Sequence, residues 1–426
     1  MYKPEYDSYY SILRHELVKA QGCTEPIAIA FAAAKARALL GVAPERIELS
    51  CSGNMVKNAM GVVVPNSGGA RGIDVAAILG ALGGEDGLEL EVLSHVTEAD
   101  IAQMQVLRTG SFCKCILCED EEPLFIQVKA FSGEHWTQVT IRHTHTNITE
   151  LIRDGVSVFA EQENENRSAP PPSKEILSFK NILDFAKNAD VNTLKEILHP
   201  QIELNCNIAK EGLTHAYGAQ VGQTVLDCQD DCVRTRACAK AAAGSDARMG
   251  GCLLPVVINS GSGNQGITVS VPVVEYASHL QAPEEKLYRA LAISNPMAIH
   301  LQRYIGSLSA FCGAVSAACG SGAAIAYLLG GDDSTIARTV TNTLGNVSGI
   351  ICDGAKSSCA AKIYSAVNAA VLAAEMSIHG RAFCPGEGIV TDDIETTIRS
   401  IGHVGKVGMR STDSVVLNLM LSHGNI

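Results

Sequence analysis

Residues 310–331 read AFCGAVSAACGSGAAIAYLLGG, a run in which Ala, Gly and Ser fill most positions. The run has the length of a helix, and its small side chains would let neighbouring helices approach closely. Segments of helical length, also rich in Ala or other small residues, occur at 234–244, 286–305, 333–350 and 359–380. We therefore predict that the second half of the chain is mostly a bundle of closely packed helices, which also explains an aromatic content of only 5%.

The first half has a mixed pattern. Two helices are predicted over residues 9–22 and 25–41, and short runs with alternating residue types follow them. The predicted strands are RIELSCSG (46–53), FCKCILCE (112–119), LFIQVKAF (124–131) and TQVTIRHTHTNI (137–148), with SGEH (132–135) as a hairpin turn. The first half is thus predicted to be an α+β domain.

A break in composition separates the two halves. Residues 160–176, AEQENENRSAPPPSKEI, combine charge, Asn, Ser and three consecutive prolines within an otherwise apolar chain. Such a stretch is typical of a linker or an exposed crossing. We predict an α+β domain over residues 1–165 and a mainly helical domain over residues 174–426.

Overall composition limits the class of protein. The 426 residues include 33 Lys and Arg against 45 Asp and Glu, a formal charge of −12 without a basic cluster, so nucleic acid is not an expected partner. Hydrophobic residues make up 46% of the chain, and the mean hydropathy is +0.14. The N-terminus lacks an apolar region, and no stretch approaches the roughly 18 apolar residues of a membrane helix. We expect a cytoplasmic protein with no membrane partner.

The chain has fifteen cysteines and no secretion signal, so a disulfide framework is a poor explanation for them. Most free cysteines pack as small buried hydrophobes. Strand alternation sends Cys113 and Cys115 to one face and Cys118 to the other, and Cys228 and Cys232 have ordinary helical spacing. We interpret these cysteines as structural.

Four cysteines have a different setting. In ICDGAKSSC (351–359), Cys352 lies at a helix end or tight turn, and Cys359 opens the next apolar helix, where the helix terminus favours a thiolate. With Cys312 on a neighbouring helix, they could form a three-thiolate site. Cys23 lies in QGCTEPIAIA (21–30), a helix cap in which a thiol would be partly exposed and activated. The alternative for Cys23 is a plain turn between helices.

Polar loops suggest a binding site. NSGSGNQG (259–266) has the composition of a backbone N–H nest that can hold a carboxylate, and it lacks the Lys-Ser/Thr end of a phosphate-binding loop. SGNMVKN (52–58) could supply a cation and amides. Asp246 and Arg248 could form an ion pair that shapes the cavity. Ordinary solvated turns remain the alternative for both loops.

These residues belong to a wider resemblance. The chain resembles, end to end, the L-cysteine desulfidase family, also called the UPF0597 or serine dehydratase alpha-chain-like family. The matching segments are GCTEPIAIA, SGNMVKNAMGVVVP, HTNI, SDARMGG, NSGSGNQGI, LSAFC and ICDGAKSSC. The second half is also similar to the catalytic chain of iron–sulfur L-serine dehydratases. Those enzymes space the last two ligand cysteines more widely than the seven positions found here, so the desulfidase branch fits better.

The resemblance implies a [4Fe-4S] cluster held by Cys312, Cys352 and Cys359, with one iron open for chemistry. It implies β-elimination of L-cysteine to pyruvate, ammonia and hydrogen sulfide. Cys23 is the first candidate for the base and His145 the second. Cys23 could instead be a displaceable fourth ligand of the cluster.

The substrate is expected to be a small amino acid, bound between the two domains. The candidate substrate-binding residues are Asn54, Lys57, Asn58, Thr146, Asn147, Ser260, Gly261, Ser262, Gly263 and Asn264. His143 and His145 would share a strand face. The sequence leaves open whether the chain forms a homodimer.

Other functions remain as alternatives. The nearest is an L-serine dehydratase. A non-catalytic iron–sulfur redox or sensor protein would fill all four cluster positions with permanent thiolates. A pyridoxal-phosphate lyase would need a phosphate cup beside a buried lysine, for which the sequence gives no convincing candidate. A structural protein stabilised by zinc is the last option.

Overall fold

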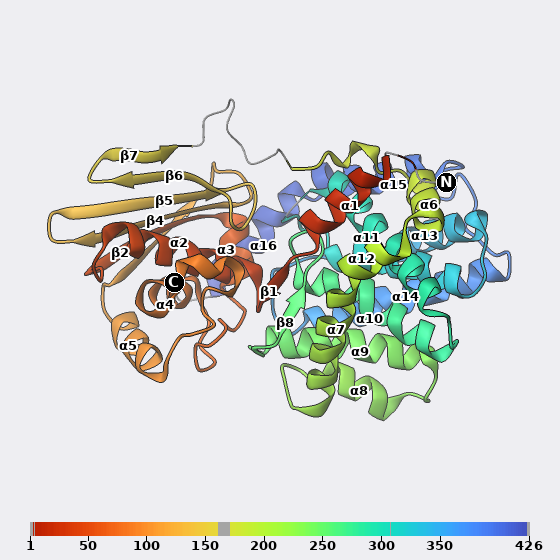
Figure 1. Cartoon of the computed structure of the whole chain (residues 1–426), viewed down its shortest axis with the longest axis horizontal. Coiled ribbons are helices and arrows are strands. Elements are labelled where there is room, and N and C mark those ends of the chain that lie inside the picture. Colours follow the sequence, from red (N-terminus) through yellow and green to blue (C-terminus); the bar gives the residue numbers. More distant parts are fainter. Residues whose placement is uncertain (1–2, 4, 161–170, 307, 424–426) are drawn as a thin grey trace.

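The computed structural model describes residues 3, 5–160, 171–306 and 308–423. Figure 1 shows two lobes side by side. The sheet lobe comprises residues 24–160, and the helical lobe comprises residues 171–408 together with the first helix, α1 (Glu5–Glu16). The predicted α+β first half and mostly helical second half are confirmed. Residues 161–170 of the predicted linker lie outside the described residues.

The sheet lobe is built on one six-stranded sheet with the strand order β3-β2-β4-β5-β6-β7. Strands β2 and β3 are parallel, and every other neighbouring pair is antiparallel. The strands are β2 (Arg46–Ser52), β3 (Cys113–Cys118), β4 (Phe125–Ser132), β5 (His135–Arg142), β6 (Ile148–Arg153) and β7 (Val156–Ala160).

Two apolar helices cover one face of this sheet. Helix α2 (Thr24–Leu40) packs on β4 and β5, α4 (Ile73–Gly83) packs on β2 and β3, and the two helices contact each other. Alternation along β2 buries Ile47, Leu49 and Cys51, as a half-buried strand requires. The lobe is completed by α3 (Gly53–Ala59), the 3₁₀ helix η1 (Asp86–Glu91) and α5 (Glu98–Arg108).

Two sequence predictions need correction here. The helix predicted over 9–22 ends at Glu16, because residues 19–21 are taken up by a strand that pairs with the helical lobe. The strand predicted over 137–148 stops at Arg142, because a turn with His143 at a φ of 68° breaks it before β6 begins. His143 and His145 therefore do not share a strand face. Helices α3, α4 and α5 and strands β6 and β7 were not predicted.

Helix α12 (Gly313–Leu328) lies at the centre of the helical lobe, where it contacts α10, α11, α13 and α14. The small side chains allow this packing. A Cβ at Gly320 would lie only 2.3 Å from the Ser294 carbonyl oxygen of α11. The other elements are η2 (Lys174–Ile176), α6 (Phe179–Asn188), α7 (Val191–Thr214), α8 (Val221–Cys228), α9 (Val233–Met249), α10 (Gly263–His279), α11 (Glu284–Ile305), α13 (Asp333–Val347), α14 (Cys359–Ile378), α15 (Ile394–His403), the π-helical turn η3 (Val404–Gly408) and α16 (Arg410–His423).

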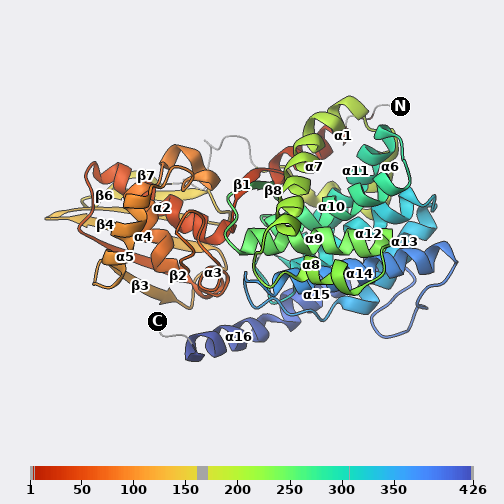
Figure 2. The same cartoon turned by 90° about the horizontal axis from the view of Figure 1, so that it is seen from below.

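Both ends of the chain cross between the lobes. Strand β1 (Lys19–Gln21) pairs antiparallel with β8 (Pro255–Val257), and Tyr9 of α1 stacks on Phe185 of α6 with ring centroids 4.6 Å apart. In the opposite direction, α16 leaves the helical lobe and packs on α3 of the sheet lobe (Figure 2).

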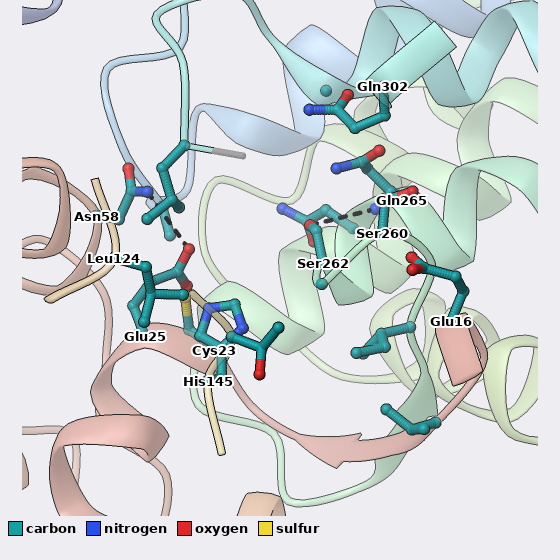
Figure 3. A pocket seen from close by; sticks show the side chains of 18 of the residues that line it. Glu16, Cys23, Glu25, Asn58, Leu124, His145, Ser260, Ser262, Gln265 and Gln302 are labelled. Atoms are coloured by element: carbon teal, nitrogen blue, oxygen red, sulfur yellow. Dashed lines mark hydrogen bonds between the residues drawn. The ribbon is translucent and has the colours of Figure 1, made fainter. Parts of the chain in front are cut away.

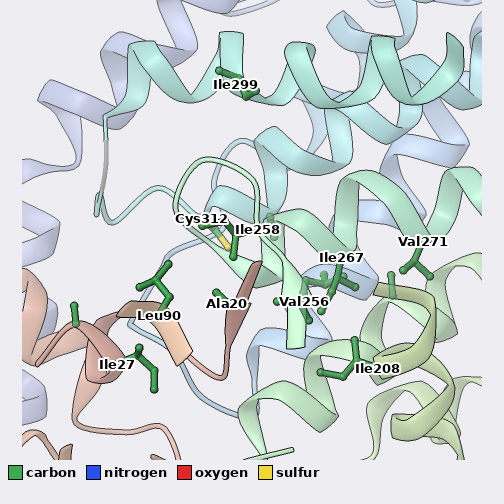
Figure 4. Close-up of a cluster of buried hydrophobic side chains, with 14 of the residues drawn as sticks. Ala20, Ile27, Leu90, Ile208, Val256, Ile258, Ile267, Val271, Ile299 and Cys312 are labelled. Carbon is green, nitrogen blue, oxygen red and sulfur yellow. The ribbon is translucent and has the colours of Figure 1, made fainter. Parts of the chain in front are cut away.

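The apolar core continues across the junction. Ala20, Ile27 and Leu90 belong to the same buried cluster as Ile258 and Cys312 (Figure 4). No helix among the described residues is both long and apolar enough to cross a membrane.

Candidate active site

A pocket of about 830 Å³ opens between the two lobes. This volume lies within the range of small-molecule sites. Its walls come from chain segments far apart in the sequence: the end of α1 and the start of α2, the turn before β6, the end of α9, the start of α10, and the loops before α12 and α14. The predicted site between the two halves thus corresponds to an actual cavity.

Three cysteines share one wall of this pocket. Cys312 is the N-cap of α12, Cys352 lies in the loop before α14, and Cys359 is the first residue of α14. Two backbone hydrogen bonds join their loops: the Cys312 N–H donates to Ile350 O at 3.1 Å, and the Cys352 N–H donates to Ala310 O at 2.7 Å. The three thiols that the sequence singled out are therefore brought together by paired loops.

The protein alone does not stabilise Cys312 and Cys359 as thiolates. Burial raises the pKa of Cys312, and the neighbouring Cys352 and Cys359 raise it further. Burial also raises the pKa of Cys359, and Cys352 again adds to the effect. A cationic group bound beside them would be needed to hold Cys312 and Cys359 as thiolates at neutral pH.

Cys23 lines the same pocket and belongs to a small buried cluster with Val62 and Met249, against which Cys359 packs. It is the N-cap of α2 and is only 2% exposed, whereas the sequence argument expected a partly exposed thiol. Its Sγ donates to Oε2 of Glu25 at 2.9 Å. Burial, followed by the charge of Glu25, raises the pKa of Cys23 well above its ordinary value. Cys23 is therefore a thiol with a carboxylate as its proton acceptor, not a thiolate activated by the helix terminus.

Glu25 is a buried carboxylate that lines the pocket (Figure 3). Asn58 Nδ2 donates to its Oε1 at 3.3 Å. Thr24 Oγ1 lies 3.1 Å from Oε2 and 3.0 Å from Gly261 O, and either oxygen can accept a hydrogen bond from the Thr24 hydroxyl. Although burial acts to raise it, the pKa of Glu25 is lowered by His145, by the hydrogen bond from Cys23 and by Arg248. Glu25 is thus held ionised.

His145 lies in the turn between β5 and β6, facing Glu25 (Figure 3). Its Nε2 is buried and has no hydrogen-bond partner among the described residues. Burial lowers its pKa, and Arg248 lowers it further against the opposing effect of Glu25. The imidazole is therefore neutral at neutral pH, with a nitrogen available inside the pocket. His143 is exposed and pairs instead with Glu122 at 2.7 Å.

The loop before α10 lies against this histidine. A Cβ on Gly261, which has a φ of 77°, would be 3.4 Å from Cε1 of His145. Ser262 is the N-cap of α10, and its Oγ accepts the N–H of Gln265 at 3.4 Å. The side-chain oxygens of Asn264 and Gln265 have no partner among the described residues.

Arg248, at the end of α9, also lines the pocket. It is 2% exposed and, in the described part of the chain, forms neither a side-chain hydrogen bond nor a salt bridge. The ion pair expected between Arg248 and Asp246 is not formed. Asp246 instead accepts the Gly222 N–H at 3.0 Å, and burial raises the pKa of this carboxyl to about 6.

Unsatisfied polar atoms concentrate in this pocket. Of twelve buried side-chain nitrogen and oxygen atoms without a partner among the described residues, seven belong to residues that line it. They are in Asn58, His145, Arg248, Asn264, Gln265, Gln302 and Arg303. Because an unpaired buried polar atom costs free energy, this concentration indicates a site that binds a polar ligand.

The chain is similar to a known protein family over most of its length. The family model for the serine dehydratase alpha chain matches residues 88–418. The chain belongs to the serine dehydratase alpha chain family. It is 50% identical to a UPF0597 protein of Lachnoclostridium phytofermentans, a match that covers 98% of this chain and 100% of the relative. UPF0597 proteins of Desulfitobacterium hafniense and Finegoldia magna are 46% and 45% identical, and each match covers 97% or more of both chains.

The serine dehydratase alpha chain model begins at residue 88, so it includes the three clustered cysteines, His145 and Arg248 but not Cys23, Glu25 or Asn58. The matches to the UPF0597 relatives span nearly the whole chain. The half of the pocket formed by the start of α2 therefore belongs to the part shared with these relatives.

Several predicted substrate-binding residues reach the pocket and others do not. Those that line it are Asn58, Thr146, Ser260, Gly261, Ser262 and Asn264. Asn54, Lys57, Asn147 and Gly263 are not among the lining residues. The Asn54 side chain donates to Leu308 O at 2.6 Å, and Lys57 pairs with Asp413, so both join the lobes together.

The sequence did not identify Glu25 and Arg248, two charged residues of the site, as candidate ligand-binding groups. Glu25 lies within GCTEPIAIA and Arg248 within SDARMGG, so both segments had been recognised. A carboxylate at a helix start and an arginine at a helix end have ordinary surface roles, and only their burial in one cavity distinguishes them.

Proposed function

We propose that the chain is a [4Fe-4S]-dependent lyase that converts L-cysteine to pyruvate, ammonia and hydrogen sulfide by β-elimination. One observation carries the proposal: three thiols share a pocket with a neutral histidine, a thiol–carboxylate pair and a set of unpartnered polar atoms. Membership in the serine dehydratase alpha chain family supports lyase chemistry.

The residues present fit an iron–sulfur cluster. Cys312, Cys352 and Cys359 form an all-thiol donor set, and such soft ligands suit iron–sulfur clusters. No group of three or more His, Cys, Asp or Glu side chains in the described part of the chain is arranged to hold a single metal ion. A cluster binds its thiolates through separate iron atoms and therefore accepts thiols spaced more widely. When bound, it would supply a Lewis-acidic iron that polarises the leaving thiol or hydroxyl.

The chain's own residues would then bind substrate and move protons. Elimination removes the α-proton and the β-sulfur, giving hydrogen sulfide and 2-aminoacrylate, which tautomerises and hydrolyses to pyruvate and ammonium. His145 is our first candidate for accepting the α-proton, because its imidazole is neutral and its Nε2 has no partner in the part of the chain that the structure describes. Cys23 can accept it only after passing its own proton to Glu25.

Cys23 also stays a candidate for the displaceable fourth ligand of the cluster, because it lines the same pocket as the three thiols. The loop of residues 259–266 is the candidate for binding the substrate carboxylate. Its Ser260 has a positive φ of 50°, which is costly for a residue with a Cβ and is found mostly at functional sites.

L-serine dehydratase is the second candidate function, favoured by the description of the matching family model. The two substrates differ only in the leaving atom, so the same pocket serves both. Relative turnover of L-cysteine and L-serine by one preparation decides between them. A purely electron-transferring role is disfavoured, because seven unpartnered polar atoms line a cavity that such a role would not need.

Anaerobic purification followed by iron and sulfide analysis and a pyruvate assay tests the proposal. We expect a brown protein with about four irons per chain that releases sulfide and pyruvate from L-cysteine. Cys352→Ala should lose the colour and at least about 99% of the activity, because a cluster ligand is removed. Cys384→Ala, at an exposed cysteine remote from the pocket, is the matched control and should keep both. A colourless wild-type protein that still makes pyruvate would contradict the proposal.

A further inference from the structure

Arg248 and Glu25 are two buried, opposite charges that face the same pocket. They do not pair with each other, since no nitrogen–oxygen distance between them is within 4.0 Å. Neither residue forms a salt bridge in the described part of the chain. They act on each other only across the cavity, and a buried charge without a contacting group of opposite charge is costly, so each of them calls for a compensating group inside the cavity.

Arg248 is placed to meet an anion. It is 2% exposed, its Nε has no partner among the described residues, and it lies beside the first turn of α10. Gly263 makes this contact feasible, since a Cβ there would come within 2.3 Å of the Arg248 Nε. The N-terminal N–H groups of a seventeen-residue helix also favour an anion. Guanidinium and helix terminus together form a site suited to a carboxylate.

Glu25 is placed to meet a cation. Its Oε2 accepts from Cys23 and Thr24, whereas Oε1 accepts, among the described residues, a single weak hydrogen bond of 3.3 Å, from Asn58. A carboxylate oxygen can accept two hydrogen bonds, so Oε1 has capacity for another donor. Glu25 is only 9% exposed, so bulk water and salt offer it little compensation.

We propose that Arg248 and the first turn of α10 bind the α-carboxylate of the substrate and that Glu25 binds its α-ammonium group. The pocket then selects free α-amino acids by both charged ends, whatever their leaving group. This inference rests on the proposed function for the identity of the reaction but is tested by binding alone. The sequence suggested that the loop of residues 259–266 holds the carboxylate. The inference adds Arg248 as the positive charge that holds the carboxylate and Glu25 as the negative charge that holds the amine.

The test uses unreactive probes that differ by one charged group. L-Alanine keeps both charges, L-alaninamide lacks the carboxylate, and L-lactate lacks the ammonium. Calorimetric titration of the purified full-length chain should give an affinity for L-alanine at least about 10-fold above that for either analogue, since a charged hydrogen bond is removed in each case.

Two variants, each of which removes one of the two charges, should each abolish one of the two binding preferences. Arg248→Met should bind L-alanine and L-alaninamide equally while keeping its preference over L-lactate. Glu25→Gln should bind L-alanine and L-lactate equally while keeping its preference over L-alaninamide. These ratios are measured within one variant, so they do not depend on comparing its folded fraction with that of the wild type.

The matched controls remove charges that are already paired. Arg142→Met removes an arginine outside the pocket lining whose Nη1 lies 2.6 Å from Glu121, and Glu16→Gln removes a buried carboxylate already paired with Lys174 at 2.6 Å. Both should keep the wild-type preferences. Preferences that persist in Arg248→Met or Glu25→Gln, or a wild-type chain that does not bind L-alanine, would overturn the inference. A wild type that shows the preferences but does not turn over L-cysteine or L-serine would instead refute the proposed function.

Discussion

His145 and Cys23 differ as proton acceptors because of the groups around each atom. The Cys23 thiol already donates to Glu25, and burial favours its protonated form. The His145 imidazole is kept neutral by burial and by Arg248, and its Nε2 has no competing partner among the described residues. We therefore propose the reverse of the order suggested by the sequence, with His145 before Cys23.

The pH profile tests the role of His145. Because its pKa is lowered from 6.5, the neutral base form persists below that pH, and kcat/KM should fall only as the pH drops through the lowered value. His145→Gln should remove this acidic limb, lower kcat by roughly 10²- to 10⁴-fold, and suppress exchange of the substrate α-hydrogen with deuterated water.

His143→Gln is the control, because this neighbouring histidine is exposed and pairs with Glu122. It should keep the wild-type profile. An unchanged acidic limb and unchanged exchange in His145→Gln would assign the acceptor role to Cys23 instead.

At the level of elements, the clustered cysteines depend on how two loops are held. The loop before α12 and the loop before α14 pair through Phe311 and Ile351. Helices α16 and α3 support both loops: Asp413 of α16 accepts the Ala310 N–H at 2.8 Å and pairs with Lys57 of α3, whose Nζ lies 3.5 Å from Cys352 O. Lys57, expected to bind substrate, instead connects α3 and α16 to both cysteine loops.

Breaking the Lys57–Asp413 pair should destabilise the chain. Asp413→Asn leaves the 1% exposed Lys57 ammonium unpaired, and we expect a loss of roughly 3 kcal/mol of unfolding free energy together with lower iron content after reconstitution. Lys57→Met should cost less, because Asp413 keeps the Ala310 N–H and is partly exposed. Urea denaturation and iron analysis measure both effects.

Lys187→Met is the matched control, since its pair with Asp333 is exposed on both sides and should contribute less than about 1 kcal/mol. A loss for Asp413→Asn no larger than that of this control would show that the buried pair does not hold the cysteine loops.

At the scale of the whole molecule, both ends of the chain connect the two lobes. Strand β1 pairs with β8, α1 packs on α6, and α16 packs on α3, where a Cβ at Gly53 would lie 2.5 Å from Cδ2 of Leu417. The domain boundaries at 165 and 174 stay a prediction. We propose that the two lobes function as one unit because their shared pocket needs both.

A protease site introduced within residues 161–170 tests this proposal. After cleavage, the two fragments should co-elute on size-exclusion chromatography and keep most of the activity, because the junction is formed elsewhere. Ending the chain after Met409 as well should let the fragments separate at lower urea concentration, since Asp413 and Leu417 are lost. Fragments that separate without denaturant, or a single fragment with full activity, would contradict it. The elution volume of the uncut chain also reports whether it is a homodimer, which stays a prediction, as does a cytoplasmic location.

The sequence by itself determined the fold class, five helices of the second half (α9, α11, α12, α13 and α14) and four strands of the first half. These follow from local periodicity and from spacing along the chain, which short-range physics controls. The turn after Arg142, strand β1 and the roles of Glu25, Arg248 and Lys57 were decided only by the tertiary structure. Each of these features depends on segments that are far apart in the sequence. Burial between the lobes makes an unpaired charged side chain costly and shifts the pKa of a titratable one. A local sequence pattern does not show which distant group such a side chain will face.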